Sequence, residues 1–319
     1  MYMAKDMDSM PHLTAEDRKR LGITLCGMNL KTPVIGASGT YGFGMEYGDF
    51  IDLADVGAVV SKGLTPLPRE GNPGVRIAET PSGMLNSIGL ENPGVDHFLE
   101  HILPESRKLG TAFIANFSAG CVDEFAVMAE KLDVPGIDAV EVNISCPNVK
   151  DGGIVFGTDP HAAAAVTRAV REHTSKPVIM KLSPNVTDIT EIARAVEAAG
   201  ADAVSLINTL MGMVVDIERH RPLLGNVTGG LSGDAVRPVA LRMVWQTANA
   251  VKIPVIGMGG ISSAEDAIAF MMAGAAAVEV GAENFRDPTA VVRIAKDMSK
   301  WMKAHGYESP ADLIGILES

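Results

Sequence analysis

The chain has 319 residues, a length typical of one α/β barrel, and 47% of them are apolar, enough for a large hydrophobic core. The net charge of −12 disfavours a surface that wraps nucleic acid, which would carry the opposite sign. No apolar run is long enough to predict a membrane span.

The cysteine content argues against a metal site or a disulfide framework. The three cysteines, Cys26, Cys121 and Cys146, form no Cys-x-x-Cys pair and are odd in number. They are too few to ligate an iron–sulfur cluster through cysteine alone. We therefore expect no metal on this chain and a reducing, cytoplasmic compartment.

The predicted elements begin after a polar segment, residues 1–20, which lacks the apolar core of a secretory signal. We interpret it as a frayed N-terminal extension before one catalytic domain over residues 21–319. Eight short, nearly continuous apolar runs then predict parallel strands buried on both faces. They are residues 32–37, 58–61, 112–117, 139–143, 178–182, 203–207, 255–258 and 277–280.

Helical patterns lie between most of these strands, and residues such as Asp159 and Ser263 provide cap-like starts. The predicted helices are residues 45–55, 122–132, 159–172, 187–199, 234–250 and 264–273. The alternation predicts the α/β class and a single (β/α)8 TIM barrel. Residues 64–110 and 210–233 are too long for simple connections, and we expect binding loops there.

A small or polar residue closes each predicted strand, and in such a barrel these residues meet at the C-terminal end. Asparagine and lysine are poor strand formers, so their repetition there favours binding groups over structural caps. The closing residues are Ser38, Lys62, Asn116, Asn143, Lys181, Asn208, Gly259 with Gly260, and Gly281.

The glycines that close the last two strands predict a phosphate site. Gly259-Gly260 and Gly281 expose backbone N–H groups beside a helix start, which attracts anions. Lysines and amides continue around the same rim, so the phosphate would belong to a cofactor. Lys181 would face a ring that gains negative charge on reduction, and Asn116 and Asn143 would hydrogen-bond its edge. These groups fit FMN.

A second set of residues would face the substrate. It comprises Lys62, Asn86, Ser87, Ile88, Gly89, Leu90, Asn143, Asn208 and Thr209. Asparagine both donates and accepts, which suits a ring with alternating N–H and C=O groups, and Lys62 would pair with a carboxylate. Asn86 could instead form a turn, and Lys62 could reach solvent.

Cys146 is the candidate base. It precedes a proline on a polar loop beyond the strand that ends at Asn143, and Gly152, Gly153 and Gly157 follow. A thiol with a pKa of about 8.5 can accept a proton near neutral pH. We interpret Cys26 and Cys121 as buried small apolar residues instead.

With these residues in place, the chain resembles the class 1 dihydroorotate dehydrogenases, and within them the class 1B catalytic subunits, from about residue 21 to residue 301. Eight motifs in the same order carry the resemblance. They are Ser61-Lys62-Gly63, Arg69-Glu70-Gly71-Asn72-Pro73, Asn86-Ser87-Ile88-Gly89-Leu90, Asn143-Ile144-Ser145-Cys146-Pro147-Asn148, Lys181-Leu182-Ser183-Pro184, Ile207-Asn208-Thr209, Gly229-Gly230-Leu231-Ser232-Gly233 and Gly257-Met258-Gly259-Gly260.

The resemblance implies oxidation of dihydroorotate to orotate in pyrimidine (UMP) biosynthesis. Cys146 would take the C5 proton while the C6 hydride passes to flavin N5. It also implies that the substrate-facing set above holds the dihydroorotate. The implied FMN contacts are Ser38, Lys62, Gly63, Asn116, Asn143, Lys181, Ile207, Gly233, Gly259, Gly260, Gly281 and Ala282.

Residues 148–153 resemble class 1B, because class 1A tends to have a Pro-Gly-Lys-Pro run there. Class 1B implies a second subunit that carries FAD and a 2Fe–2S cluster and passes electrons to NAD. It also implies a heterotetramer, two copies of each subunit around a homodimer core of this chain.

Two adjacent positions depart from the family, which often has threonine in place of Ala282 and no acid in place of Glu283. Glu283 should either point away from the phosphate or reduce flavin affinity, and we expect flavin to bind through the backbone N–H groups. Three other proteins stay open as alternatives. They are a dihydropyrimidine dehydrogenase-like subunit acting on uracil or thymine, with histidine in place of Asn148; a flavin-dependent RNA-modifying barrel, which the net charge opposes; and a non-redox phosphate-binding barrel.

Overall fold

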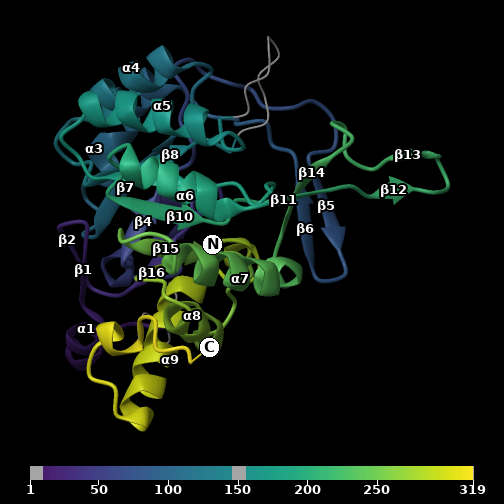
Figure 1. Cartoon of the computed structure of the whole chain (residues 1–319). Helices are drawn as coiled ribbons and strands as arrows, with labels where there is room; N and C mark the ends of the chain where they lie inside the picture. Colours follow the sequence, from purple (N-terminus) through teal and green to yellow (C-terminus); the bar gives the residue numbers. More distant parts are fainter. Residues whose placement is uncertain (1–9, 146–155, 319) are drawn as a thin grey trace, which may run out of the picture.

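The computed structural model describes residues 10–145 and 156–318, and eight parallel strands in this part of the chain close into a TIM barrel (Figure 1). All eight predicted strands are confirmed, with ends that differ by at most two residues. In order around the barrel they are β3 (Val34–Gly36), β4 (Ala58–Val60), β7 (Ala112–Phe117), β8 (Ala139–Asn143), β9 (Val178–Lys181), β10 (Ala203–Leu206), β15 (Val255–Met258) and β16 (Ala277–Val280).

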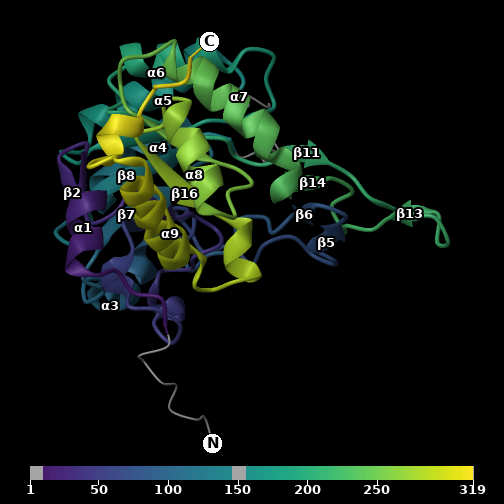
Figure 2. The ribbon, with the colours of Figure 1, turned by 90° about the horizontal axis from the view of Figure 1, so that it is seen from below.

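Amphipathic helices cover the outside of the barrel (Figures 1 and 2). Asp159, Asp188 and Ser263 cap three of them by accepting hydrogen bonds from backbone N–H groups of the first turn. The helices are α4 (Val122–Leu132), α5 (Pro160–Glu172), α6 (Ile189–Ala198), α7 (Arg237–Ala248), α8 (Ala264–Met272) and α9 (Ala290–His305). Among the described helices, none is both long and apolar enough to cross a membrane.

One prediction about a helix was wrong, and one long helix was not predicted. Residues 45–55 form two 3-10 turns, η2 (Met45–Tyr47) and η3 (Leu53–Asp55), instead of one helix. Gly48 ends the first turn, and the Asp52 carboxylate starts the second by accepting from Ala54 N at 2.9 Å, so the chain is interrupted between them. Helix α9 was not predicted, although its buried residues follow helical spacing.

The described part of the segment before the barrel, from residue 10 onward, contains a helix packed on the barrel. Helix α1 (Ala15–Leu21) begins with a capping box in which Thr14 and Asp17 bond reciprocally. The Arg18 guanidinium donates to the buried Asp55 carboxylate at 2.7 and 2.9 Å, and Ser299 Oγ of α9 donates to Asp17. These contacts fix α1 against α9 and the turn at Asp55.

The interior of the barrel is layered, because side chains alternate along each strand. The hairpin of β1 (Ile23–Leu25) and β2 (Met28–Leu30) closes the N-terminal end, where its apolar side chains join an apolar layer. This layer contains Ile35, Ala58, Ile114, Ala139, Ile179, Ala203, Ile256 and Ala277. Two positions further along five of these strands, toward the C-terminal end, the residues are polar and buried: Asn116, Glu141, Lys181, Ser205 and Glu279.

The two long insertions pair with each other and form an arm that projects from the barrel (Figures 1 and 2). The first also contains the short helical turns α2 (Val95–His97), η4 (Phe98–Ile102) and α3 (Leu103–Ser106). The arm sheet runs in the order β11 (Leu210–Gly212), β14 (Gly229–Ser232), β6 (Gly83–Asn86) and β5 (Ile77–Thr80), and its tip carries β12 (Val215–Asp216) and β13 (Arg221–Pro222).

Candidate active site

The residues that close the strands lie at one end of the molecule, because parallel strands in a closed barrel all point the same way. Asn143 and Lys181 are the last residues of β8 and β9 and face each other in register. Asn116 is the penultimate residue of β7. Lys62 and Asn208 follow their strands by two residues. The predicted site residues on the barrel therefore share its C-terminal end.

Two amides meet above β8 and β10. Asn208 Nδ2 donates to Asn143 Oδ1 at 3.2 Å, and Ser145 N donates to the same oxygen at 3.1 Å. Thr209 N donates to Asn208 Oδ1 at 2.7 Å. These bonds fix both amide planes, which leaves Asn143 Nδ2 as a donor for a bound molecule.

Asn116 has a buried acceptor without a partner. Its Nδ2 donates to Glu141 Oε2 at 2.5 Å, whereas Oδ1 receives no hydrogen bond from the described residues. A Cβ placed on Gly63 would lie 2.9 Å from this oxygen and 3.7 Å from a methyl of Leu90. The missing side chain at Gly63 thus keeps space open beside an acceptor that needs a donor.

Beneath these amides, the polar layer of the barrel is charged. Lys181 Nζ lies 3.3 Å from Glu141 Oε2 and 3.8 Å from Glu279 Oε2. Burial disfavours the charged form of Lys181, but the two carboxyl groups raise its pKa above the usual value. Lys181 is therefore a fixed cation at the floor of the site.

The loop that follows β6 is held by Asn72 and by the arm. Asn72 Nδ2 donates to Ser87 O and Oγ at 3.1 and 3.0 Å, and Asn72 N donates to Ile88 O. Gly89 is required here, since its φ is 80° and a Cβ would lie 2.5 Å from Asn72 N. Leu90 also has a positive φ of 56°. Asn86 Nδ2 donates to Gly230 O of β14 at 3.4 Å, on the side of the arm where Thr209 packs against Gly230.

The glycines of the last two strands form a close-packed turn. A Cβ on Gly259 would lie 3.2 Å from Ile207 Cγ1, and one on Gly260 would lie 2.8 Å from Gly233 O. Gly259 and Gly260 have φ values of 122° and 77°, which side chains rarely adopt. Gly281 and Ala282 begin η6 (Ala282–Phe285) after β16. Ile207 and Gly233 are therefore neighbours of the Gly259–Gly260 turn.

Ser38 and Lys62 lie on the adjoining part of the rim. Ser38 Oγ donates to Ser61 O at 2.7 Å, and Lys62 N donates to Gly42 O at 2.7 Å. The Lys62 side chain is half-buried, and in the described part of the chain its ammonium has no carboxylate within 4.0 Å. Cys146, the predicted base, lies outside the described residues.

The comparisons with known proteins identify the family. The dihydroorotate dehydrogenase family model matches residues 20–302. The chain belongs to the dihydroorotate dehydrogenase family. It is 54% identical over 302 residues to the dihydroorotate dehydrogenase B (NAD(+)) catalytic subunit of Geobacter sp. strain M21, which covers 94% of this chain and 99% of the relative.

Two further relatives of the same name lead to the same family assignment. The protein of Geobacter sulfurreducens is 56% identical over 299 residues, 93% of this chain and 98% of its own length. That of Phocaeicola vulgatus is 53% identical over 299 residues, 93% of this chain and 99% of its own length. The similarity thus spans nearly the whole chain in each case.

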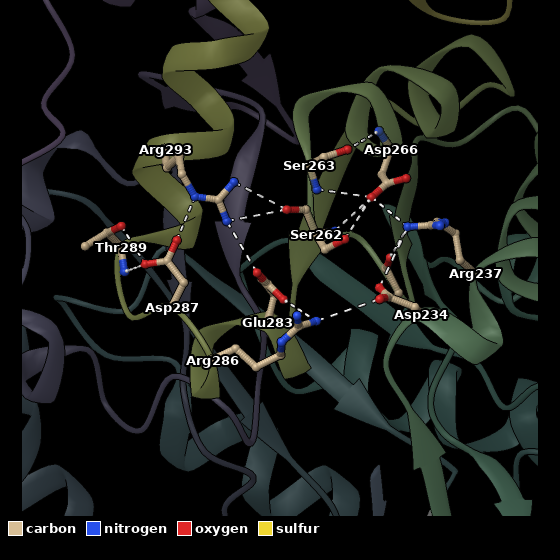
Figure 3. A network of polar contacts seen from close by, with 11 residues as sticks. Asp234, Arg237, Ser262, Ser263, Asp266, Glu283, Arg286, Asp287, Thr289 and Arg293 are labelled. Atoms are coloured by element: carbon tan, nitrogen blue, oxygen red, sulfur yellow. Dashed lines mark hydrogen bonds and ion pairs between the residues drawn. The ribbon is translucent and has the colours of Figure 1, made fainter. Parts of the chain in front are cut away.

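Glu283, the acid at a position that departs from the family pattern, forms ion pairs with two arginines (Figure 3). Glu283 lies 3.4 Å from both Arg286 Nη1 and Arg293 Nη2, and Arg286 also reaches Asp234 at 3.7 Å. Burial raises the pKa of Glu283, while the two arginines oppose that shift. The Glu283 carboxylate is therefore held in an ion-pair network with Arg286 and Arg293.

Sequence reasoning missed three residues of the site's floor, Glu141, Ser205 and Glu279. Each is fully buried on a strand that is otherwise apolar, and Glu141 and Glu279 occupy the same place in two Ala-Val-Glu-Val segments. An acid inside a continuous apolar strand was the signal that could have revealed the two glutamates, since burying a carboxylate is costly without partners.

Proposed function

We propose that the chain is the FMN-containing catalytic subunit of a class 1B dihydroorotate dehydrogenase and oxidises dihydroorotate to orotate. The observation that carries the proposal is that the Asn143–Asn208 amide pair, the open acceptor Asn116 Oδ1 and the buried Lys181 lie at the same end of the barrel. A flat ring with N–H and C=O groups requires this mixture of donors and acceptors. The family and the names of its relatives point to the same substrate.

The described residues fit FMN. Asn116 Oδ1 is a buried acceptor that lacks a donor, and Lys181 provides a positive charge for a ring that becomes more negative on reduction. The absence of a side chain at Gly63 keeps space open beside Asn116 Oδ1, and the Gly259–Gly260 turn would offer backbone N–H groups to the phosphate. Ser38, Ile207, Gly233, Gly281 and Ala282 complete the proposed contact set.

The chemistry that FMN supplies when bound is acceptance of the C6 hydride. The chain's own residues would bind and orient the substrate. Asn143, Asn208 and Thr209 would hydrogen-bond the pyrimidine ring from one side, and the Asn86–Leu90 loop from the other. The Lys62 ammonium would bind the carboxylate, which distinguishes dihydroorotate from uncharged pyrimidines. Cys146 would remove the C5 proton, a role based on its sequence context alone.

We further propose an electron-transfer partner. The relatives are named NAD(+)-linked catalytic subunits, which supports a second subunit carrying FAD and a 2Fe–2S cluster in a heterotetramer built on a homodimer of this chain. The arm leaves apolar side chains exposed, including Leu67, Met213 and Ile217, and exposed apolar groups of this kind favour association. Cytoplasmic location follows from the same assignment. Co-expression with a candidate partner and measurement of the complex mass test this part.

The decisive experiment is anaerobic reduction of the bound flavin by dihydroorotate. The wild type should bleach, and Cys146→Ser should react at least about tenfold more slowly at neutral pH, equivalent to about 1.4 kcal/mol of added barrier. Bleaching by dihydrouracil instead of dihydroorotate would favour the dihydropyrimidine dehydrogenase-like alternative. Equal rates in wild type and variant would remove Cys146 from the role of base.

A further inference from the structure

The barrel strands enclose two acids but only one base. Among the eight strands, titratable residues occur only on β8, β9 and β16, as Glu141, Lys181 and Glu279. Their side chains are 1%, 7% and 1% exposed. If both acids were ionised, the interior would hold an uncompensated negative charge, which is strongly unfavourable away from water.

The two acids have unequal surroundings. Glu141 Oε1 accepts from Ser205 Oγ at 2.7 Å, and its Oε2 accepts from Asn116 Nδ2 at 2.5 Å and from Lys181 Nζ at 3.3 Å. Lys181 lies farther from Glu279, at 3.8 Å, and Glu279 Oε2 receives no hydrogen bond from the described residues. The surroundings therefore stabilise a carboxylate at Glu141 but not at Glu279.

The pKa values of the two acids agree with this asymmetry. Burial raises the pKa of Glu279 well above its usual value, and the charge of Glu141 adds to the effect. Burial also opposes ionisation of Glu141, but Lys181 and the hydrogen bonds from Ser205 and Asn116 bring its pKa below the usual value. Opposite directions of this kind are expected when two neighbouring carboxyl groups carry one proton between them.

We propose that Glu279 keeps a proton in the folded protein and donates it to Glu141, so that the interior next to the flavin site has no net charge. The consequence for the cofactor rests on the proposed function. If Glu279 lost this proton to solvent, a negative charge would appear beside Lys181. That charge would oppose reduction of a ring that gains negative charge and would lower its midpoint potential. Glu279 is thus a positioning residue that acts on the flavin through Lys181.

The proton can be detected without flavin, from the stability of the apoprotein. An unfolded glutamate ionises near pH 4.3, so above about this pH the unfolded chain loses a proton that folded Glu279 retains, and the wild type becomes less stable as pH rises. Glu279→Gln carries no such proton. The Tm of Glu279→Gln minus that of the wild type should therefore increase between about pH 4.5 and about pH 9. The exposed control Glu130→Gln should show no such increase.

A constant Tm difference for Glu279→Gln at all pH values would overturn the proposal.

A second comparison tests the sharing of the proton. In Glu141→Gln, Glu279 is the one counter-charge for Lys181 that remains among the described residues, and it should ionise. Adding Glu279→Gln to this background should then lower the Tm at neutral pH, opposite to its effect in the wild type. If Glu279→Gln changed the Tm in the same direction in the wild type and in Glu141→Gln, the result would contradict a shared proton.

The flavin-loaded protein gives an independent readout, the midpoint potential as a function of pH. Wild type and Glu279→Gln should agree near neutral pH, and the wild-type potential should fall below that of the variant at alkaline pH. Parallel curves would refute the link between Glu279 and the flavin. A protein that binds no flavin would defeat the proposed function, whereas the apoprotein measurements would still decide whether Glu279 holds a proton.

Discussion

Asn143 Oδ1 accepts a hydrogen bond from Asn208 Nδ2 at 3.2 Å, so the ends of two barrel strands that are not neighbours are joined by their amides. In the proposed function, this bond would orient each amide before a ring binds. Such preorganisation lowers the entropy lost on binding.

Asn208→Ala should weaken orotate binding about tenfold to a hundredfold, because losing hydrogen bonds to a bound ring and loosening Asn143 costs roughly 1–3 kcal/mol. Titration of the flavin spectrum with orotate measures the Kd. Asn249→Ala, at the exposed end of α7, is the control and should leave the Kd unchanged. An unchanged Kd in Asn208→Ala would exclude Asn208 from the site.

Lys62→Met should raise the KM for dihydroorotate by about tenfold to a hundredfold, the range expected when a charged hydrogen bond of roughly 1.5–3 kcal/mol is lost. The KM for the methyl ester of dihydroorotate should change little, because that substrate has no carboxylate. Lys19→Met, on the exposed surface of α1, serves as the control. Equal losses for acid and ester would show that Lys62 does not recognise the carboxylate.

Gly260→Ala and Gly306→Ala form a matched pair with φ values of 77° and 78°. A Cβ at Gly260 would lie 2.7 Å from Arg237 Cβ, whereas one at Gly306 meets nothing within 4 Å. Gly306→Ala should lose about 1 kcal/mol of stability from backbone strain, and Gly260→Ala should lose more, because its Cβ would also overlap Arg237. Only Gly260→Ala should also lower FMN affinity, by at least about tenfold if a backbone contact to phosphate is lost. Fluorescence quenching of FMN measures the Kd, and equal affinities would place the phosphate elsewhere.

Asp55→Ala should lower the free energy of unfolding by roughly 1–3 kcal/mol, because the Arg18 guanidinium and Leu13 N lose a buried acceptor. Arg18 is partly exposed, with 42% of its side chain accessible, so solvent moderates the loss. Urea unfolding of this variant and of the exposed Asp49→Ala control gives the comparison. A neutral effect would mean that α1 contributes little to stability.

Cys26 should resist alkylation. Burial raises the pKa of its thiol to about 11, with a further contribution from Asp202. At about pH 8 the reactive thiolate is therefore roughly a thousandth of the population, and its rate should increase about tenfold per pH unit until the pKa is reached. Cys121 is exposed and should react first. Site-resolved mass spectrometry after iodoacetamide treatment distinguishes the two, and faster labelling of Cys26 would contradict the shift.

The strands were predictable because each is a local apolar run, and closure of the barrel then brings their last residues to one end. The prediction that Cys121 is a buried apolar residue was wrong, since it precedes α4 on the surface. The pairing of Glu141 with Lys181 and Glu279 depends on how three separate strands align around the barrel, which no local pattern determines. The same holds for the pairing of the two insertions in the arm.

The arm has a consequence for folding order. Asn86 and Gly230 are partners in β6 and β14, yet 144 residues separate them in the chain. Contacts this distant in sequence form late, because closing so long a loop is entropically costly until the intervening strands are in place. The Asn86–Leu90 loop would therefore acquire its final position only after six of the eight barrel strands have been synthesised. A nascent or truncated chain that lacks residues 229–232 would not have a complete substrate site.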